Sequence, residues 1–555
     1  MKFLFLIVAL TSCSLLSSLV PAEAVPTRGS KMLITGSSPY ANEIGQKIAA
    51  DGGNVVDVAV AVGAAMAVTN PYNASLGGGG FALVRFNGKV HVLDFREIAP
   101  RKTNEKYYLD KGQMASRDGG HAIGVPGYPA GLVSLHAKFG KLPWKNVIRP
   151  AVQLAKFGFR IGGEWHQRTK DNKGRLNKAG KGFFFKRSGH AYNPGQKLKQ
   201  KELSRALSLF RYSKKNGFYT GSVADDIVSS VKESGGVISY KDLRNYKVRW
   251  LKPITTEYEG HTIHMMPPPS SGGVVIKTAL SLIEKLNLKN KKPLSSEELH
   301  LLAEIESRAF RGRLLLGDPD FHQNPMDLIL SKKYLNEMAS SITPNRATQL
   351  APLKEMAPVK ESTETTHFTV MDRKGNAVSL TVTLNGAYGS GVVTDRYGIV
   401  LNNEMDDFTT HPDKPNMFGL IQGRGNLVQP GKRPLSSMTP TIVTKGNETI
   451  MALGAPGGPK IISSVLQVLY RTLSLNFDMD KAIQYPRVHH QFLPNKLFVY
   501  SDKHSPDVLS KLKTMGHNVV EHEFAARVNG IRRDPKTGFL EAAFDSRAEG
   551  SVAGY

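Results

Sequence analysis

Two short segments of alternating residues, joined by a compact turn, follow directly on the dipeptide Thr365-Thr366. Residues 367–371 and 377–384 alternate between apolar and polar side chains in the manner of strands. The five residues between them, 372–376, are Asp-Arg-Lys-Gly-Asn, a composition typical of turns. The pattern therefore predicts a β-hairpin that begins at this dipeptide.

The register of this hairpin decides which side chains meet at its open end. If the loop is centred on Lys374, Thr365 lies opposite Thr383. Directly opposed residues of antiparallel strands have Cβ atoms about 4.5 to 5.5 Å apart, and Asn385 shares a face with Thr383 because it is two residues further along. The hairpin then gathers polar groups beside Thr365, although a slip of one residue would separate them.

A threonine in this position suggests a particular nucleophile. A threonine hydroxyl is a poor nucleophile near neutral pH and needs a base, and a threonine at a chain end has its own α-amino group, with a reference pKa of about 7.7 to 8.0. Such a mechanism requires a break between Glu364 and Thr365. Together with the later segments 402–407 and 433–438, this dipeptide favours an amidase with a threonine nucleophile.

The chain begins like an exported protein. Met1 and Lys2 precede an apolar run, and Ala22-Glu23-Ala24 forms an Ala-x-Ala site, so residues 1–24 are interpreted as a removed signal peptide. The alternative is a lipoprotein box that ends at Cys13 and would anchor the chain through this cysteine. Cys13 is the only cysteine, so cleavage after Ala24 leaves no thiol. We expect a periplasmic or extracellular protein with no later membrane span.

The formal net charge is +26, and half of this surplus lies between Arg160 and Lys215. A nucleic-acid channel would need interleaved aromatic residues and a recognisable module, and neither is present in the sequence. The favoured interpretation is a solvated basic face without a nucleic-acid partner. Attraction to an anionic envelope surface is the alternative.

Upstream of the hairpin the sequence predicts mixed α and β structure. Two helices with a turn at Gly52-Gly53 are expected within 42–68, and two strands at 81–86 and 91–95. Helical patterns dominate 131–233 and 274–315, whereas 345–364 has little periodicity and is expected to be exposed.

No metal or organic cofactor is predicted. The histidines show no tight ligand spacing, and the tetraglycine 77–80 lacks the Gly-Lys-Ser/Thr ending of a phosphate loop. Close backbone packing is the favoured use of these glycines.

Several motifs in a fixed order resemble the γ-glutamyltranspeptidase family. They are Gly52-Gly53-Asn54-Val55-Val56-Asp57, Thr365-Thr366-His367-Phe368, Leu401-Asn402-Asn403-Glu404-Met405-Asp406-Asp407-Phe408, Pro434-Leu435-Ser436-Ser437-Met438, Pro456-Gly457-Gly458 and Ala553-Gly554-Tyr555. The resemblance covers nearly the whole mature chain. It implies an α+β fold, a four-layer αββα N-terminal-nucleophile hydrolase sandwich, formed jointly by a large subunit (25–364) and a small catalytic subunit (365–555).

The resemblance also implies a reaction. The Thr365 hydroxyl would attack the carbonyl of Glu364, and an N-to-O acyl shift would break the peptide bond to give an ester and a free α-amino group on Thr365. Water would then hydrolyse this ester, which leaves a heterodimer. The same hydroxyl would then take the γ-glutamyl group from glutathione or other γ-glutamyl compounds. Water, an amino acid or a peptide would accept that group.

Site roles are carried over from the family residue by residue. Thr383 would orient the nucleophile, Gly457 and Gly458 would bind the oxyanion through backbone N–H groups, and the remaining residues would bind the substrate. In that set Arg96, Ser436 and Ser437 match groups that hold an α-carboxylate, and Glu404, Asp407 and Asn385 match acceptors of an α-ammonium. The alternatives are an ordinary strand threonine for Thr383, a structural salt bridge for Arg96, a simple turn for the two glycines, and exposure to solvent for Glu404 and Asp407.

Two positions depart from some bacterial members, which have glutamine where this chain has Glu404 and tyrosine where it has Phe418, within a predicted lid at 412–425. Two other functions stay open. One is an acylase of the same superfamily that acts on glutaryl amides, which lack the α-amino group. The other is a non-catalytic, basic envelope-binding protein that retains the fold.

Overall fold

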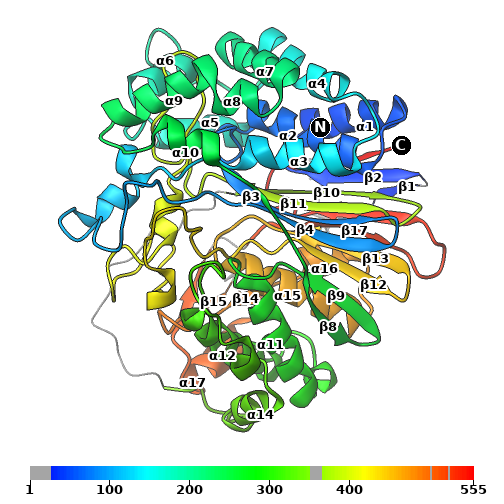
Figure 1. Cartoon of the computed structure of the whole chain (residues 1–555). Coiled ribbons are helices and arrows are strands. Elements are labelled where there is room, and N and C mark those ends of the chain that lie inside the picture. Colours follow the sequence, from blue (N-terminus) through cyan, green and yellow to red (C-terminus); the bar gives the residue numbers. More distant parts are fainter. Residues whose placement is uncertain (1–26, 30, 350–364, 500–502, 523–525) are drawn as a thin grey trace, which may run out of the picture.

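The computed structural model describes residues 27–555 apart from 30, 350–364, 500–502 and 523–525. Two stacked β-sheets form the centre of the molecule, and a layer of helices covers the outer face of each (Figure 1). The expected four-layer αββα sandwich of an α+β protein is confirmed. The leader 1–24, with Cys13, and the expected cleavage residue Glu364 lie outside the described residues. So do residues 350–364 of the segment 345–364 that is expected to be exposed.

The sheet next to the upper helices in Figure 1 contains the predicted hairpin. Its neighbouring strands are antiparallel. In spatial order the strands are β19 (Ser551–Gly554), β2 (Met32–Gly36), β10 (Thr366–Asp372), β11 (Ala377–Thr383), β3 (Gly79–Phe86), β4 (Lys89–Phe95) and β7 (Arg249–Leu251).

The second sheet also mixes strands from both sides of Thr365, and its pairs are antiparallel too. In spatial order they are β1 (Thr27–Gly29), β18 (Leu540–Phe544), β17 (Asn529–Arg533), β13 (Glu448–Gly454), β12 (Thr441–Lys445), β9 (His261–Met265) and β8 (Ile254–Tyr258). Segments before and after Thr365 are therefore interleaved in both sheets.

The helices divide into two layers by their position in the sequence (Figure 1). The upper layer consists of α1 (Pro39–Ala50), α2 (Val55–Thr69), α3 (Tyr128–Phe139), α4 (Trp144–Phe157), α5 (Gly163–Asp171), α6 (Lys178–Phe184), α7 (Lys201–Ser213), α8 (Asn216–Tyr219), α9 (Gly221–Glu233) and α10 (Tyr240–Asn245). The lower layer includes α11 (Gly272–Lys285), α12 (Ser296–Arg311), α14 (Lys332–Ser340), α15 (Lys460–Leu473), α16 (Met479–Gln484) and α17 (Pro506–Thr514).

Smaller elements complete the fold. A side sheet is formed by β14 (Val488–His489), β15 (Leu497–Val499) and β16 (Val519–Glu521), and a two-stranded ribbon by β5 (Phe159–Arg160) and β6 (Lys197–Leu198). The short helix α13 (Met326–Ile329) precedes α14.

Helix α2 shows how the sequence builds the core. Asn54 caps it by accepting hydrogen bonds from the N–H groups of Val56 and Asp57, and the Asp57 carboxylate accepts one from the N–H of Asn54. This capping box satisfies backbone donors that the first turn would otherwise leave unpaired. Every residue of α2 is buried, as expected for a helix that is apolar on all sides.

The tetraglycine serves close packing, as expected. A Cβ atom on Gly78 would lie 2.2 Å from the carbonyl oxygen of Thr383, and one on Gly80 would lie 2.2 Å from that of Thr381. Only glycine lets β3 approach β11 this closely. This close packing of β3 fixes the position of β11, the strand that ends at Thr383.

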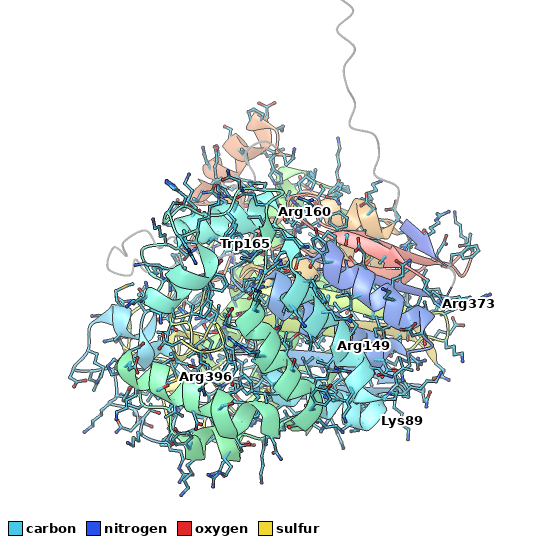
Figure 2. All side chains as sticks on the ribbon, turned by 90° about the horizontal axis from the view of Figure 1, so that it is seen from above. Lys89, Arg149, Arg160, Trp165, Arg373 and Arg396 are labelled. Atoms are coloured by element: carbon cyan, nitrogen blue, oxygen red, sulfur yellow. The ribbon has the colours of Figure 1, made fainter. Side chains whose placement is uncertain are left out.

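Other expected elements are confirmed: the helix pair in 42–68, the strands near 81–86 and 91–95, and the helices in 131–233 and 274–315. The basic stretch 160–215 lies in the upper helical layer, and many of its lysines are exposed. Figure 2 looks onto this layer, where Arg149, Arg160 and Arg396 are labelled and exposed, while Trp165 of α5 is buried. Within the described residues, no helix has the length and apolar character needed to cross a bilayer.

Candidate active site

The hydroxyl groups of Thr365 and Thr383 meet at the open end of the β10–β11 hairpin. Thr366 pairs with Val382, which confirms the register predicted from the five-residue loop. The two threonine Oγ1 atoms are 3.1 Å apart, within hydrogen-bonding distance, and both residues are buried. The strand geometry thus places one hydroxyl directly against the other.

The hydrogen bonds around Thr383 favour one direction for this contact. The backbone N–H of Asn385 donates to Thr383 Oγ1 at 2.8 Å, so this oxygen already accepts one hydrogen bond. If Thr383 donates its own proton to Thr365 Oγ1, Thr365 retains its proton for transfer to a base. The arrangement suits a hydroxyl that is to become a nucleophile.

Most of the predicted site residues line one cavity next to Thr365. It has about 290 Å³ of space, part of it open to solvent. Its lining residues are Arg96, Thr365, Thr383, Asn385, Glu404, Asp407, Phe418, Leu420, Ser436, Ser437, Met438, Gly458 and Ile461. Gly457 is the one predicted site residue among the described residues that does not line it. The structure brings these side chains together, and their individual roles stay predictions.

A buried ion cluster lies at the polar end of the cavity. The Arg96 guanidinium contacts Glu404 through one nitrogen and Asp407 through the other, the latter at 2.6 Å. Burial alone would lower the pKa of Arg96, but the two carboxyl groups reverse this and raise it. Burial raises the pKa of Glu404 and of Asp407, with Arg96 opposing. The predicted carboxylate-binding and ammonium-binding residues therefore form one cluster.

Glu97, next to Arg96, was not singled out from the sequence. Both of its carboxyl oxygens are buried without a hydrogen-bond partner, and the nearest is 3.9 Å from the Arg96 guanidinium. Burial, followed by the charge of Glu404, raises the pKa of Glu97 well above its usual value. Its position directly after Arg96 was visible in the sequence, but its orphaned oxygens are visible only in the fold.

Ser436 is fixed by the loop that precedes α11. Its backbone N–H donates to the carbonyl of Pro269 at 2.7 Å, and its own carbonyl accepts from the N–H of Ser271 at 2.9 Å. Ser436 Oγ accepts from the N–H of Met438 at 3.1 Å. The proline- and serine-rich loop 267–271 therefore supports the cavity wall that contains Ser436 and Ser437.

The predicted lid is tied to the ion cluster by residues that sequence reasoning missed. The Asn416 side chain donates to Asp407 at 3.1 Å and accepts from the N–H of Phe418 at 3.0 Å. Gln422 donates to the carbonyl of Asp407 at 2.7 Å and accepts from Arg313, which is fully buried. Asn416 and Gln422 lie inside the expected lid, but no spacing in the sequence marks them as its anchors.

Gly457 and Gly458 lie between β13 and α15. Both have positive φ angles, 128° and 57°, which favour glycine. A Cβ atom on Gly458 would lie 2.7 Å from the ring of Phe418, so the lid packs directly on this glycine. Backbone N–H groups before a helix start are suited to a developing oxyanion, because the first N–H groups of a helix lack intrahelical partners.

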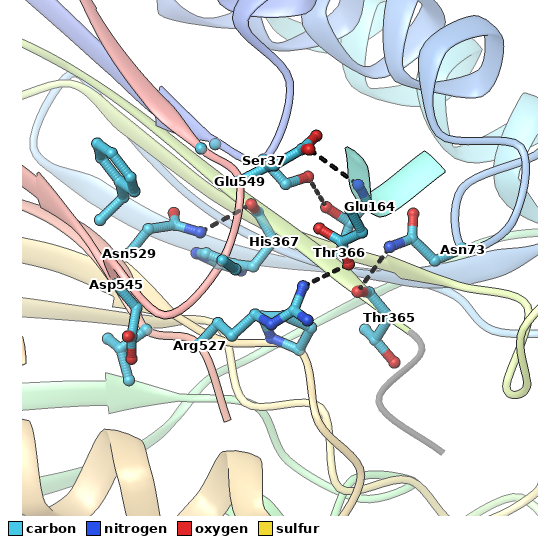
Figure 3. A pocket seen from close by; sticks show the side chains of 16 residues that line it. Ser37, Asn73, Glu164, Thr365, Thr366, His367, Arg527, Asn529, Asp545 and Glu549 are labelled. Atoms are coloured by element: carbon cyan, nitrogen blue, oxygen red, sulfur yellow. Dashed lines mark hydrogen bonds and ion pairs between the residues drawn. The ribbon is translucent and has the colours of Figure 1, made fainter. Parts of the chain in front are cut away.

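A second cavity lies on the other side of the Thr365 backbone (Figure 3). There Ser37 and Thr366 share a hydrogen bond of 2.6 Å, and Asn73 donates to the carbonyl of Thr365 at 3.3 Å. Arg527 pairs with Glu164 at 2.6 Å across the same cavity. These contacts hold Thr365 and the start of β10 from behind, and the Thr365 hydroxyl contacts Thr383 on the side of the main cavity.

Comparison with known proteins agrees with this geometry. The model of the family described as gamma-glutamyltranspeptidase matches residues 41–555. The "Glutathione hydrolase proenzyme" of Escherichia coli (strain K12) is 38% identical over 544 residues, 96% of this chain and 93% of that protein. The protein of the same name from Pseudomonas sp. (strain A14) is 38% identical over 531 residues, covering 94% of this chain and 92% of its own.

Solved structures show the same fold. A cephalosporin acylase from Bacillus halodurans superposes with a TM-score of 0.84 at 25% identity, covering 97% of this chain and 98% of its own. The Helicobacter pylori gamma-glutamyltranspeptidase gives a TM-score of 0.55 at 35% identity and covers 59% of this chain and 93% of its own. Matched by the family model from residue 41 to its end, this chain belongs to the γ-glutamyltranspeptidase family.

Proposed function

We propose that the protein is a self-processing γ-glutamyltransferase and glutathione hydrolase. It cleaves the γ-glutamyl amide bond of glutathione and related compounds and passes the glutamyl group to water, amino acids or peptides. The observation that carries this proposal is the contact of 3.1 Å between the Thr365 and Thr383 hydroxyls, at the edge of a cavity that also contains an arginine and two acids. The relatives named above are themselves called glutathione hydrolases.

In this proposal the chain breaks between Glu364 and Thr365 into a large subunit, 25–364, and a small subunit, 365–555. The interleaving of strands in both sheets supports it, because the two fragments would stay together as a heterodimer after cleavage. The word "proenzyme" in the relatives' names is consistent with it. So is the Helicobacter pylori chain, which corresponds to only 59% of this one.

Donor recognition follows from the charges of the cluster. Arg96, with Ser436 and Ser437, binds the α-carboxylate of the glutamyl group, because a guanidinium fork matches a planar carboxylate. Glu404 and Asp407, assisted by Asn385, bind the α-ammonium group. Without substrate Arg96 pairs with both acids, so a zwitterionic donor has to exchange one buried set of ion pairs for another.

Turnover then uses the freed terminus of Thr365. Its α-amino group takes the hydroxyl proton as Oγ1 attacks the γ-carbonyl carbon, and backbone N–H groups at Gly457 and Gly458 stabilise the oxyanion. Collapse of the tetrahedral intermediate transfers the proton to the leaving amine and gives a γ-glutamyl ester on Thr365. Attack by water or an acceptor amine restores the hydroxyl.

A glutaryl acylase is the alternative from the same superfamily, and the cephalosporin acylase neighbour has the same fold. The ion cluster favours a γ-glutamyl donor, because Arg96 supplies one positive charge for two carboxyl groups and a substrate ammonium adds a second. The test compares γ-glutamyl and glutaryl anilides. We expect turnover of the γ-glutamyl compound, with a rise in KM for Asp407→Asn, whereas preference for the glutaryl compound would contradict the proposal.

A non-catalytic envelope-binding protein is the second alternative. The threonine pair and its cavity favour an enzyme, and association of the exposed basic face with an anionic surface stays an untested prediction. Export through the leader 1–24, and the less favoured lipid anchor at Cys13, also stay predictions. N-terminal sequencing of the mature fragments tests both processing sites together.

A further inference from the structure

A cluster of two histidines and one glutamate lies in the lower helical layer, far from the hairpin. His300 and Glu304 are one turn apart on α12, and His517 lies in the turn between α17 and β16. In Figure 1, α12, α14 and α17 meet at the lower edge of the molecule. All three residues are buried, and their candidate ligand atoms lie within 4.8 Å of one another.

The tautomer of His300 is fixed by its surroundings. Its Nε2 lies 2.8 Å from the carbonyl oxygen of Thr343, and because a carbonyl only accepts, Nε2 must carry the proton. The lone pair of His300 is therefore on Nδ1, which points at Nε2 of His517 at 2.7 Å. Histidines that bind metals typically donate their second ring N–H to a carbonyl or carboxylate in this way.

Glu304 is held as an oriented carboxylate. It accepts hydrogen bonds from the N–H and hydroxyl of Thr348, at 3.1 and 2.6 Å, and from Arg308 at 2.7 Å. These donors keep its charge and fix its direction, as the outer partners of a ligating carboxylate do. Thr343 and Thr348 both belong to the segment that follows α14.

We propose that His300, Glu304 and His517 form a binding site for a divalent cation of the zinc class. Two imidazoles and one carboxylate suit Zn²⁺ and similar transition metals, with water as a fourth ligand. Two Zn–N bonds of about 2.0–2.1 Å at a tetrahedral angle place the nitrogens about 3.3 Å apart. The rings therefore separate by roughly 0.6 Å when the ion replaces the proton between them.

This site would join parts of the chain that the proposed cleavage separates. His300 and Glu304 precede Thr365, as do Thr343 and Thr348, whereas His517 follows it. Bound metal would hold the last described part of the large subunit, up to residue 349, against the small subunit. The site itself does not depend on cleavage, so an uncleaved Thr365→Ala chain should bind metal as the wild type does.

No local sequence pattern predicts this cluster, because more than two hundred residues separate His517 from α12. The expectation of no metal rested on local ligand spacing, which detects only sites built from one short segment. The proposed ion has a structural role and takes no part in the proposed reaction.

The test measures metal binding on chelator-treated full-length protein with Zn²⁺ and Co²⁺. We expect about one ion per chain by elemental analysis, visible Co²⁺ absorption, and a higher unfolding temperature with Zn²⁺. His517→Gln keeps an amide N–H toward His300 but removes the ligand, and should weaken binding at least tenfold. Glu304→Gln is a second variant that should do the same.

His264→Gln is the matched control, because this histidine contacts Thr444 and lies outside the cluster. It should bind metal like the wild type. If the chelator-treated wild type takes up less than a tenth of an equivalent, or if His517→Gln and Glu304→Gln bind as tightly as His264→Gln, the cluster is a hydrogen-bonded network only and the proposal is wrong. Since Thr365→Ala is assayed in parallel, this result is independent of the proposed enzymatic activity.

Discussion

The side-chain oxygen of Thr383 lies 3.1 Å from that of Thr365 across the end of one hairpin, and the Asn385 N–H occupies an acceptor position on Thr383. A five-residue loop sets this pairing, so the nucleophile and the residue that orients it come from a single local element. In the proposed enzyme, the contact both directs the Thr365 lone pair and stabilises the alkoxide as it forms.

Thr383→Val removes this hydrogen bond with little change in volume. A hydrogen bond to a group that develops charge contributes about 1.5–3 kcal/mol, so kcat should fall roughly 10- to 100-fold. Thr383→Ser keeps the hydroxyl and should retain most of the activity. Equal rates for the valine and serine variants in a γ-glutamyl anilide assay would show that the contact has no catalytic role.

Gly458→Ala tests the proposed oxyanion site and the packing of Phe418 on it. The left-handed φ of 57° penalises alanine, and the new Cβ would lie 2.7 Å from Phe418. Alanine keeps its backbone N–H, but this strain and the contact with Phe418 would move the N–H out of position. Loss of one oxyanion donor costs about 10²- to 10³-fold in rate, so a fall in kcat of up to this order is expected. Gly182→Ala, in a helix and with no heavy atom within 4 Å of the added Cβ, should be neutral. Wild-type kcat in Gly458→Ala would exclude an oxyanion site here.

In the proposed enzyme, Phe418 would cover the acyl-enzyme site, because it lines the same cavity as Thr365. It is buried, its N–H bonds to Asn416 and its carbonyl accepts from Gln491 at 3.1 Å. Phe418→Ala should raise the ratio of hydrolysis to transfer roughly several-fold, because water gains access to the ester. The ratio is measured with glycylglycine as the acceptor. Phe539→Ala, at an exposed position, is the control, and an unchanged ratio in Phe418→Ala would contradict the lid assignment.

His367 should make the fold sensitive to acid. Burial lowers its pKa to about 3, and its two ring nitrogens contact the hydroxyls of Thr381 and Thr369. The unfolded chain binds a proton here below about pH 6.5, whereas the folded chain does not, so the free energy of unfolding falls as the pH falls. The free energy of unfolding at pH 5 is therefore lower by about 2 kcal/mol than at pH 7.

His367→Gln removes this titration and keeps a hydrogen-bonding side chain. Urea unfolding at pH 7 and pH 5 should show a smaller pH dependence in the variant by about 2 kcal/mol. If the free energy of unfolding changes by the same amount between pH 7 and pH 5 in the wild type and in His367→Gln, His367 is not held neutral in the fold.

The parts of the site that the sequence predicts are those set by local geometry. The Thr365–Thr383 pairing follows from strand alternation and a symmetric loop, whereas the oxyanion role of Gly457 and Gly458 rests on the family resemblance, because a simple turn would explain two adjacent glycines equally well. Family resemblance then supplied Arg96, Glu404 and Asp407, but as two separate binding groups. In the structure Arg96 contacts both acids in one buried cluster. These contacts join loops more than 300 residues apart in the sequence, so no local pattern predicts them.

The lid anchors and the second cavity were beyond sequence reasoning for the same reason. Asn416 reaches Asp407 and Asn73 reaches Thr365 through irregular backbone, whose path depends on the packed fold rather than on periodicity. The sequence shows that Glu97 is an acid beside Arg96. Only the structure shows that its carboxyl oxygens are buried without hydrogen-bond partners. Long-range polar contacts are thus the part that needed the structure.

Intact-mass and N-terminal analysis of the purified protein tests the central claim most directly. Thr366→Ala, whose hydroxyl contacts Ser37 rather than Thr383, serves as the control. The wild type and Thr366→Ala should yield two fragments, the smaller starting at Thr365, while Thr365→Ala stays a single inactive chain. A wild-type protein that turns over γ-glutamyl anilide as one uncut polypeptide, or a Thr365→Ala chain cut at the same bond, would contradict the account.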